Sequence, residues 1–487
     1  MSRDVVIVGG SCAGLMAGIL LKRQGHHVHI LEQAISSERE GQAAGIGLSG
    51  AAKAFFDEHD RLAHIPMSVE IRSLAFLDPK TMKVARQFPY KGGLTSWEFC
   101  YARLRANFDG MKSAYCPEPP DLTADTGTGV FESGKRVIDV ASRAEKLVVT
   151  AEGVESGITY TYTADIVVVA DGANSQMRKQ MQPFVRRETP GYVLWRGVVP
   201  TSSLSQECVD LIGDKTVSYP MRYSYTIIYN IPGPTGSVKD GERYINFAWY
   251  YWPPSKQKTQ EILTDTDGHV HRTTLPKGKM RPEIWAAQVE IAKRSMPPLI
   301  AEIPAKIEHP FVSLISSISA KQARFFDDRL FFIGDALVQG NTYLFHSRHQ
   351  RELSPAGLSV RIETPDANTL LRSIPFGVLT TICSLRENIC QPNAGSGLTK
   401  AAREAMLLPR VLDGSLSAAD WEQQVLTLAE GERLFSRSFG SYNLRTWWWG
   451  YAVDRLKYVM YMARQRLRAR WAALWKWNTA STKTKAS

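Results

Sequence analysis

Residues 4–32 read DVVIVGGSCAGLMAGILLKRQGHHVHILE, and the order of elements in this stretch decides the fold. Asp4–Val8 is a short β-branched run, which is typical of a buried parallel strand. Leu15–Arg23 has helical spacing and stops before Gly25, and His27–Leu31 has the composition of a second strand. The stretch therefore predicts a strand–helix–strand unit of an α/β domain.

The turn at residues 9–14 has the spacing of a dinucleotide site. In such a site the first glycine makes a tight turn, the last lets the helix pack on the strand, and the helix N-terminus faces the diphosphate. Ser11 stands where the middle glycine usually lies, and it is small enough to let the backbone approach phosphate. Glu32, after the second strand, is placed to bind the ribose hydroxyls. Because all four features fall at the required spacing, we favour a dinucleotide site over a chance glycine pair. The predicted contacts are Gly9, Gly10, Ser11, Ala13, Gly14, Glu32 and Gln33.

The whole chain has the composition of a globular protein. Its 487 residues suffice for two or three domains, and 44% of them are hydrophobic. The formal net charge of +11 favours anionic cofactors or membrane lipid, whereas no finger, knuckle or repeated basic–aromatic pattern predicts nucleic-acid binding. The six cysteines show neither metal-type pairing nor disulfide density, and no cleavable leader or membrane-spanning window is visible. We therefore expect a reduced, cytoplasmic protein without a metal site.

We expect a discontinuous domain organisation. Residues 1–75, 98–185 and 321–412 are predicted to form a three-layer, Rossmann-like α/β domain. Residues 76–97 and 186–320, rich in aromatic and β-branched residues in the longer range, predict an interleaved mixed β-sheet able to roof a flat ligand. Residues 413–487 have a helical pattern.

Two further motifs follow buried strands. Asp171 and Gly172 come directly after the apolar run DIVVVA, with Arg178 six residues beyond the glycine. Such a carboxylate, glycine turn and arginine can order a loop beside a diphosphate, although Asp-Gly is also a common turn dipeptide. Gly334 and Asp335 follow the strand RLFFI, and the aspartate is placed to hold ribityl hydroxyls. Later a glycine-rich helix start, whose free N–H groups could stabilise negative charge on a flavin ring, comprises Pro392, Asn393, Ala394, Gly395 and Ser396.

Together these motifs resemble those of the FAD-dependent aromatic hydroxylases of the para-hydroxybenzoate hydroxylase class. Within the class, the chain looks most similar to relatives of 2,6-dihydroxypyridine 3-monooxygenase, on segments such as Trp195-Arg196-Gly197 and Tyr244–Tyr251. The resemblance implies that the first motif binds the ADP half of FAD, that Asp171-Gly172 lies near FAD and the incoming nicotinamide, and that Gly334-Asp335 binds the ribityl chain. It adds Gly45 and Arg103 as cofactor contacts. The class usually has an arginine where this chain has Trp97, so Arg103 or Arg105 would have to substitute.

The resemblance also implies a reaction. NADPH or NADH would reduce FAD, and a flavin C4a-hydroperoxide formed with O₂ would hydroxylate an aromatic or similar electron-rich small molecule. The predicted substrate-side residues are Trp195, Arg196 and Pro392, although ordinary sheet packing explains the first two equally well. A flavin oxidase or epoxidase on the same scaffold, and an inactive flavin-fold protein, are the alternatives.

One segment departs from the class. Gly340–Gln391, about 52 residues, separates Asp335 from Pro392, whereas a compact loop is usually shorter than about 15 residues. Joining Gln339 to Pro392 restores GDALVQPNAGSG, close to the family spacing. The segment is therefore an inserted surface excursion or, the interpretation we favour, translated intron sequence. If it is real, it would emerge beside the flavin.

The C-terminal stretch Trp447–Trp477 combines helical apolar spacing with five basic residues between positions 464 and 476. A basic helix with aromatic ends can lie on an anionic membrane surface. The alternative is a helix whose apolar side packs on the catalytic domain or on a partner in a homodimer. We favour packing on protein, because apolar helix faces mostly contact protein.

Overall fold

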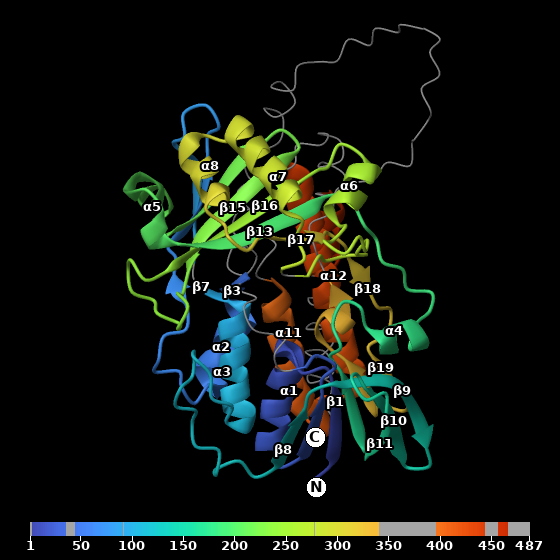
Figure 1. Cartoon of the computed structure of the whole chain (residues 1–487). Helices are drawn as coiled ribbons and strands as arrows, with labels where there is room; N and C mark the ends of the chain where they lie inside the picture. The colour runs from blue at the N-terminus through green and yellow to red at the C-terminus, as the bar shows by residue number, and fades with distance from the viewer. Residues whose placement is uncertain are drawn as a thin grey trace, which may run out of the picture.

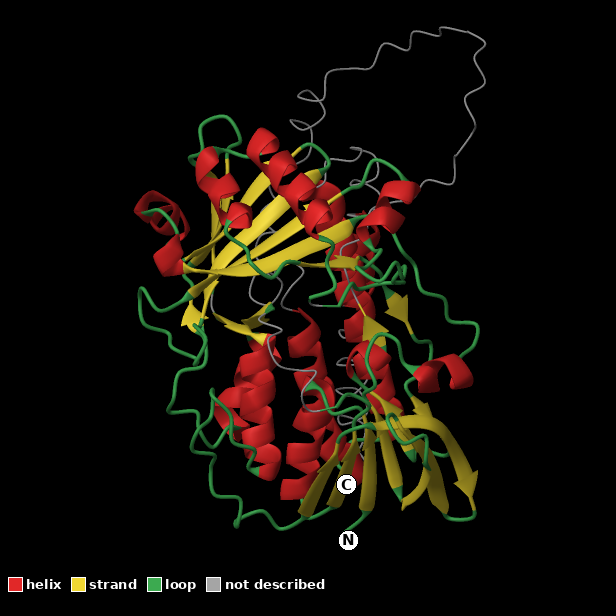
Figure 2. Cartoon of the chain, viewed as in Figure 1, coloured by secondary structure: helices red, strands yellow, loops and turns green. Residues whose placement is uncertain are grey.

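The computed structural model describes residues 2–35, 44–90, 92–276, 278–339, 396–443 and 456–465. Two sheets dominate it, one at each end of the view in Figure 1. Long helices pack beside the sheet that contains the N-terminus, and short helices cover the far side of the other sheet (Figure 2). Residues 340–395, which include the suspected insert at 340–391, lie outside the described part of the chain.

The first sheet contains the predicted strand–helix–strand unit. β1 (Asp4–Val8) pairs in parallel with β2 (His27–Leu31), and α1 (Cys12–Arg23) connects them. Four strands continue the order β19-β20-β12-β1-β2-β8, and all neighbours are parallel except β19 and β20. The ends of β1, β12 and β20 therefore lie side by side at one edge. The remaining strands of this sheet are β8 (Thr128–Glu132), β12 (Ile166–Val169), β19 (Arg324–Phe325) and β20 (Leu330–Phe332).

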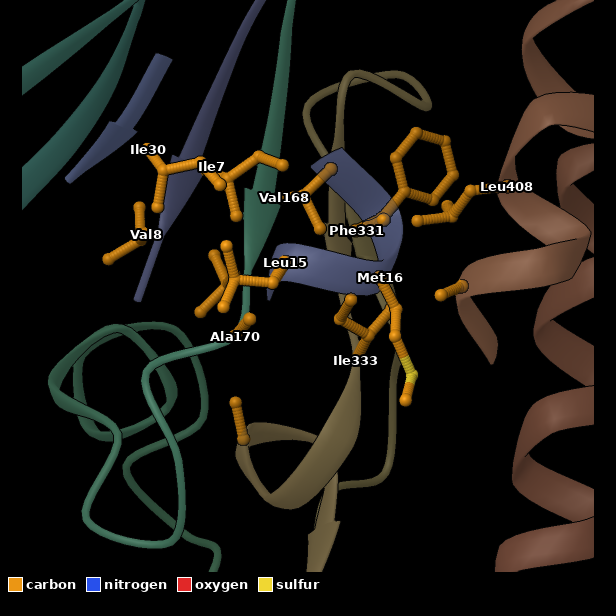
Figure 3. Close-up of a cluster of buried hydrophobic side chains, with 14 of the residues drawn as sticks. Ile7, Val8, Leu15, Met16, Ile30, Val168, Ala170, Phe331, Ile333 and Leu408 are labelled. Atoms are coloured by element: carbon orange, nitrogen blue, oxygen red, sulfur yellow. The ribbon is translucent and has the colours of Figure 1, made fainter. Parts of the chain in front are cut away.

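This sheet is the middle one of three layers, as the sequence predicts. Leu15 and Met16 of α1 lie among side chains of the strands, and Leu408 of α11 approaches from the other side of that helix (Figure 3). On the opposite face a small antiparallel sheet contributes Val140 and Val149 to the same core. The helices on the first face are α1, α2 (Gly50–His59), α3 (Trp97–Asp109), α11 (Ser396–Leu412) and α12 (Ala418–Asn443), and the small sheet contains β9 (Lys135–Arg143), β10 (Lys146–Gly153) and β11 (Thr159–Ala164).

The second sheet has seven strands in the order β17-β13-β16-β15-β14-β5-β6. Its inner face, which carries Leu194, Tyr229 and Tyr250, is directed toward the first domain, and its outer face is covered by α7 and α8. The strands are β5 (Ser73–Leu77), β6 (Val84–Pro89), β13 (Val193–Pro200), β14 (Lys215–Met221), β15 (Ser224–Ile231), β16 (Tyr244–Tyr251) and β17 (Phe311–Leu314), and the helices are α5 (Gln206–Ile212), α6 (Lys256–Ile262), α7 (Pro282–Ser295) and α8 (Pro298–Ala305).

Short elements connect the two parts. β3 (Gly45–Leu48) pairs with β7 (Gly93–Ser96), so residues 93–96 belong to a small sheet of their own and not to the seven-stranded sheet. β5 begins at Ser73, so residues 73–75 belong to the seven-stranded sheet and not to the first domain as predicted. The other domain boundaries stay a prediction. The other short elements are β4 (Val69–Glu70), β18 (Ile318–Ser319), β21 (Val338–Gln339), α4 (Gln176–Met181), η2 (Thr201–Ser203) and η3 (Gly334–Ala336).

Near the C-terminus, residues 456–465 form a helix that packs on α12. The Tyr461 hydroxyl donates to the carbonyl oxygen of Thr427, and Tyr458 is buried. Leu456 and Met460 are exposed on this helix. Among the described residues, no helix is both long enough and apolar enough to span a bilayer. The chain thus uses part of this segment for packing on protein, while membrane contact, a homodimer and cytoplasmic location stay predictions.

Candidate functional site

At three glycines in and beside the turn that begins α1, a Cβ would meet neighbouring atoms. A Cβ on Gly14 would lie 2.0 Å from the carbonyl oxygen of Gly9, and Gly9 itself has φ +101°, where other residues are strained. A Cβ on Gly10 would lie 2.4 Å from the Phe131 ring. Ser11 precedes α1 and its side chain makes no capping hydrogen bond. The first-turn N–H groups of a helix have no partner within the helix, so this end of α1 suits an anion.

Glu32 closes over the same turn. Its carboxylate accepts the Gly10 N–H at 2.7 Å through one oxygen and the Ala34 N–H at 2.8 Å through the other. The side chain is buried, whereas Gln33 beside it is exposed. Glu32 therefore lies at the turn, as a ribose-binding acid must, while also ordering its backbone.

The second motif lies directly against the first. A Cβ on Gly9 would be 2.9 Å from the Cα atom of Asp171. The Asp171 carboxylate accepts the Gln176 N–H at 2.9 Å, and burial raises the pKa of this carboxyl. Its other oxygen, Oδ1, is buried without a hydrogen-bond partner among the described residues. Gly172 has φ +77° and open space around it.

The third motif joins the other two. Gly334 follows β20, and a Cβ there would be 2.8 Å from the Cβ atom of Ala13 in the first turn of α1. Arg178 donates to the carbonyl oxygens of Asp335, at 3.1 Å, and Ala336, at 2.5 Å, and also to that of Ala173. Arg178 thus connects the loop after β12 with the loop after β20. The structure brings all three predicted motifs together at the strand ends.

Two residues of α11 complete this region, and the sequence analysis missed both. The Glu404 carboxylate accepts the Gly334 N–H at 2.6 Å, and the Lys400 ammonium lies 3.4 Å from Asp335 Oδ1. Both side chains are buried. The available signal was two charged residues, four apart, within the apolar helical pattern that follows the glycine-rich motif.

Part of the predicted site lies outside the described residues. Pro392, Asn393, Ala394 and Gly395 are among those left out. Ser396 begins α11, but its side chain is not described. Their predicted roles stay predictions.

The placement of Arg103 does not support its role as a cofactor contact, which stays a prediction. Arg103 is fully buried and donates to Asp60 at 2.9 Å and to the carbonyl oxygens of Leu62 and Ile65, which lie beyond α2. Arg105 instead has its guanidinium 3.7 Å from the centroid of the Phe131 ring, the ring that fills the space beside Gly10. Side chains two positions apart on a helix project in nearly opposite directions. Only one of the two arginines can therefore face the glycine turn.

The inner face of the second sheet meets the first domain at Gly45. The Arg196 guanidinium donates to the Gly45 carbonyl oxygen at 2.6 Å, and the Gly45 N–H donates to Asn246 Oδ1 at 2.9 Å. A Cβ on Gly45 would lie 2.7 Å from both Asn246 and Tyr229. Burial raises the pKa of Tyr229 to about 12, with the adjacent Arg196 opposing the rise. These residues form a polar cluster between the two domains.

Trp195 does not belong to that cluster. It is fully buried on the outer face, with its ring centroid 5.6 Å from that of Trp285 in α7. Side chains alternate along a strand, so Trp195 and Arg196 cannot contact the same ligand from one face. This placement does not support Trp195 as a substrate contact, and that role stays a prediction.

The arrangement fits an extended dinucleotide that carries a flat ring system. Glycines at the turn leave room that any Cβ would fill, α1 supplies N–H groups for a diphosphate, and Glu32 lies at the ribose end. Asp171 Oδ1 lacks a partner among the described residues, and Lys400 is buried against a single described carboxylate, so acceptors and donors remain for a ligand.

Comparison with known proteins agrees with this geometry. Residues 2–48 match the family model of an FAD binding domain, and residues 190–317 match that of an FAD binding domain-like family. The 2,6-dihydroxypyridine 3-monooxygenase of Paenarthrobacter nicotinovorans is 22% identical over 335 residues, which are 69% of this chain and 76% of that protein. A kynurenine 3-monooxygenase of Salinispora arenicola is 30% identical over 188 residues, which are 37% of this chain and 38% of that protein.

Solved structures show the same fold. The 2,6-dihydroxypyridine-3-hydroxylase from Arthrobacter nicotinovorans superposes with a TM-score of 0.66 at 18% identity, over 91% of this chain and 92% of that one. Klebsiella pneumoniae HpxO complexed with FAD and uric acid gives 0.57 at 14% identity, over 94% and 92%. These structures confirm the predicted α/β fold class. The FAD binding domain match and the monooxygenase relative confirm the resemblance to FAD-dependent aromatic hydroxylases and FAD as the cofactor.

Proposed function

We propose that this chain, which has the fold of the FAD-dependent aromatic hydroxylases, is an FAD-dependent monooxygenase. It would consume NADPH or NADH and O₂ and hydroxylate a small, electron-rich aromatic or heteroaromatic ring. The main observation behind this proposal is that the three motifs meet at the ends of β1, β12 and β20, opposite a polar cluster on the inner face of the second sheet. The monooxygenase activities of the sequence relatives support the same reaction class.

The first domain supplies the cofactor contacts in this proposal. The N-terminal turn of α1 would bind the diphosphate, Glu32 the ribose, and Asp335 the ribityl chain. When bound, FAD supplies electron transfer and oxygen activation, while the protein supplies orientation and electrostatics. Asp171 and Arg178 order the loop that the nicotinamide would approach.

The polar cluster would bind the ring substrate. A phenol or hydroxypyridine reacts faster as its anion, and the Arg196 guanidinium, beside Tyr229, offers positive charge at this position. Because the pKa of Tyr229 is about 12, its hydroxyl stays neutral near pH 7. Tyr229 would therefore act as a hydrogen-bond donor and not as a base. Asn246 accepts the Gly45 N–H through its amide oxygen, which fixes the position of Gly45 in the cluster.

The test is turnover of the purified full chain with NADPH or NADH and a panel of phenols and hydroxypyridines. We expect oxidation of the nicotinamide that a matching ring stimulates, and one oxygen atom from labelled dioxygen in the product. Nicotinamide-independent oxidation of substrate, with no label in the product, would assign an oxidase instead. A chain that binds FAD but is never reduced would contradict any redox role.

A further inference from the structure

We propose that Lys400 is a positioning residue for the cofactor: its ammonium holds the Asp335 carboxylate in the orientation that accepts hydrogen bonds from the ribityl chain of FAD. This inference rests on the proposed function, because it requires FAD at the strand ends. It concerns a residue on α11, which lies far from the glycine turn in sequence.

The first support is the way α11 holds the Gly334-Asp335 pair. Lys400 and Glu404 are one helical turn apart on α11. Glu404 accepts the Gly334 N–H at 2.6 Å, and the Lys400 ammonium lies 3.4 Å from Asp335 Oδ1. Each residue of the predicted ribityl motif thus has its own partner on one face of one helix.

The second support is that the main chain and the side chain of this motif are held by different residues. Arg178 binds the carbonyl oxygens of Asp335 and Ala336, so it fixes the main chain. Glu404 binds the N–H of Gly334 and also acts on the main chain. Among the described residues, Lys400 is the one that bonds to the Asp335 side chain. The rotamer of the carboxylate therefore depends on Lys400.

The third support is burial. The Lys400 side chain is 6% exposed, whereas that of Asp335 is 43% exposed. An ammonium has three donors and is costly to bury with a single long contact. Such a pair is consistent with a carboxylate anchored on its inner side by Lys400 and open on its outer side to a hydroxyl-bearing ligand. A Cβ on Gly334 would lie 2.8 Å from the Cβ atom of Ala13, so the Gly334-Asp335 motif lies beside the N-terminal turn of α1, where the diphosphate would begin.

The experiment compares FAD with ADP, because ADP carries the diphosphate and adenosine but lacks the ribityl chain. Dissociation constants of both are measured for the full chain stripped of flavin, in wild type, Lys400→Met, Asp335→Asn and the double variant. We expect each single variant to weaken FAD by about tenfold, equivalent to about 1.4 kcal/mol, and to leave ADP unchanged. The double variant should bind FAD no more weakly than the single variant with the lower FAD affinity, because both substitutions remove one contact.

Two controls separate positioning from folding. Lys22 is also a buried lysine, donating to the carbonyl oxygen of Phe108 at the other end of α1. Lys22→Met should lower the thermal midpoint without changing the ratio of FAD to ADP affinity. Lys400→Arg keeps the charge and should retain most of the FAD affinity, and it serves as the test if Lys400→Met does not fold.

Several results would overturn the inference. Equal losses for FAD and ADP in Lys400→Met would show that Lys400 acts on the ADP half. Additive losses in the double variant would show that Lys400 and Asp335 act independently. Unchanged FAD affinity in Lys400→Met would remove Lys400 while leaving the proposed function standing. A wild-type chain that binds no FAD would overturn both.

Discussion

Trp195 and Arg196 are neighbours in the chain but serve opposite faces of one sheet. The Trp195 ring packs on Trp285 with 5.6 Å between ring centroids, whereas the Arg196 guanidinium bonds to the Gly45 carbonyl oxygen at 2.6 Å. The outer face is apolar packing under α7 and α8, and the inner face holds the polar cluster. This difference predicts different consequences for two adjacent substitutions.

Arg196→Met should lower kcat/KM for a phenol or hydroxypyridine by about ten- to a hundredfold, the effect of losing one charge-assisted contact. Trp195→Phe should lower the free energy of unfolding by about 1–3 kcal/mol and leave the KM for the ring nearly unchanged. Steady-state kinetics and thermal melts of both variants check this. A larger rise of KM in Trp195→Phe than in Arg196→Met would place the substrate elsewhere.

Glu32→Ala should weaken FAD binding by about ten- to a hundredfold, because it removes a ribose contact and the acceptor of the Gly10 N–H. Glu32→Gln keeps one amide oxygen as an acceptor and should weaken FAD less. Titration of the stripped protein with FAD measures both. Wild-type affinity in Glu32→Ala would remove Glu32 from the site.

Gly10→Ala and Gly14→Ala should both impair FAD binding, but only the first should be rescued by a second substitution. The new Cβ of Gly10→Ala meets the Phe131 ring, which Phe131→Ala removes. The new Cβ of Gly14→Ala meets the backbone oxygen of Gly9, which no side-chain change can move away. Flavin content of the purified variants is the measurement. Failure of Phe131→Ala to restore any flavin to Gly10→Ala would contradict this geometry.

Part of the acid sensitivity of the fold should come from His26. Burial, with the charge of Arg3 adding to it, lowers the pKa of His26, and its Nδ1 accepts the Arg3 N–H. A histidine whose pKa is lower in the folded state contributes its full stability above its unfolded pKa, about 6.5, and this contribution is lost as the pH falls from that value through the lower pKa of the folded state. His26→Asn should therefore show a smaller drop in thermal midpoint between pH 7.5 and pH 5.5 than wild type. An identical drop in both proteins would exclude His26 as a source.

Removing Gly340–Gln391 should retain or improve FAD binding. Asp335, which precedes the segment, and Lys400, which follows it, are in contact. The parts of the chain that flank the segment therefore lie close together in the fold. The deletion leaves Pro392, Asn393, Ala394 and Gly395 to join Gln339 to Ser396, which is a common length for a connection. Flavin content and nicotinamide oxidation of the shortened chain are compared with those of the full chain. Loss of flavin only in the shortened chain would make the segment part of the structure, and a transcript that retains its codons would count against an intron.

The sequence alone determined the parts that depend on local order. The strand–helix–strand unit, the glycine turn and Glu32 were predicted because each requires only neighbouring residues at a set spacing. The strands ending before Asp171 and Gly334 were visible for the same reason. That their ends meet at one edge is shown by the parallel sheet of the structure.

Tertiary structure decided which of two adjacent residues faces the site. β13 is buried or partly buried from Val193 to Val199 and α3 is buried on most sides, so neither alternation nor helical spacing shows which side faces the site and which side packs. Trp195 was therefore interchangeable with Arg196, and Arg103 with Arg105, until the covering helices and the Asp60 pair were seen. Lys400 gained its partner only when α11 packed beside η3, a contact between residues 65 positions apart that no local pattern encodes.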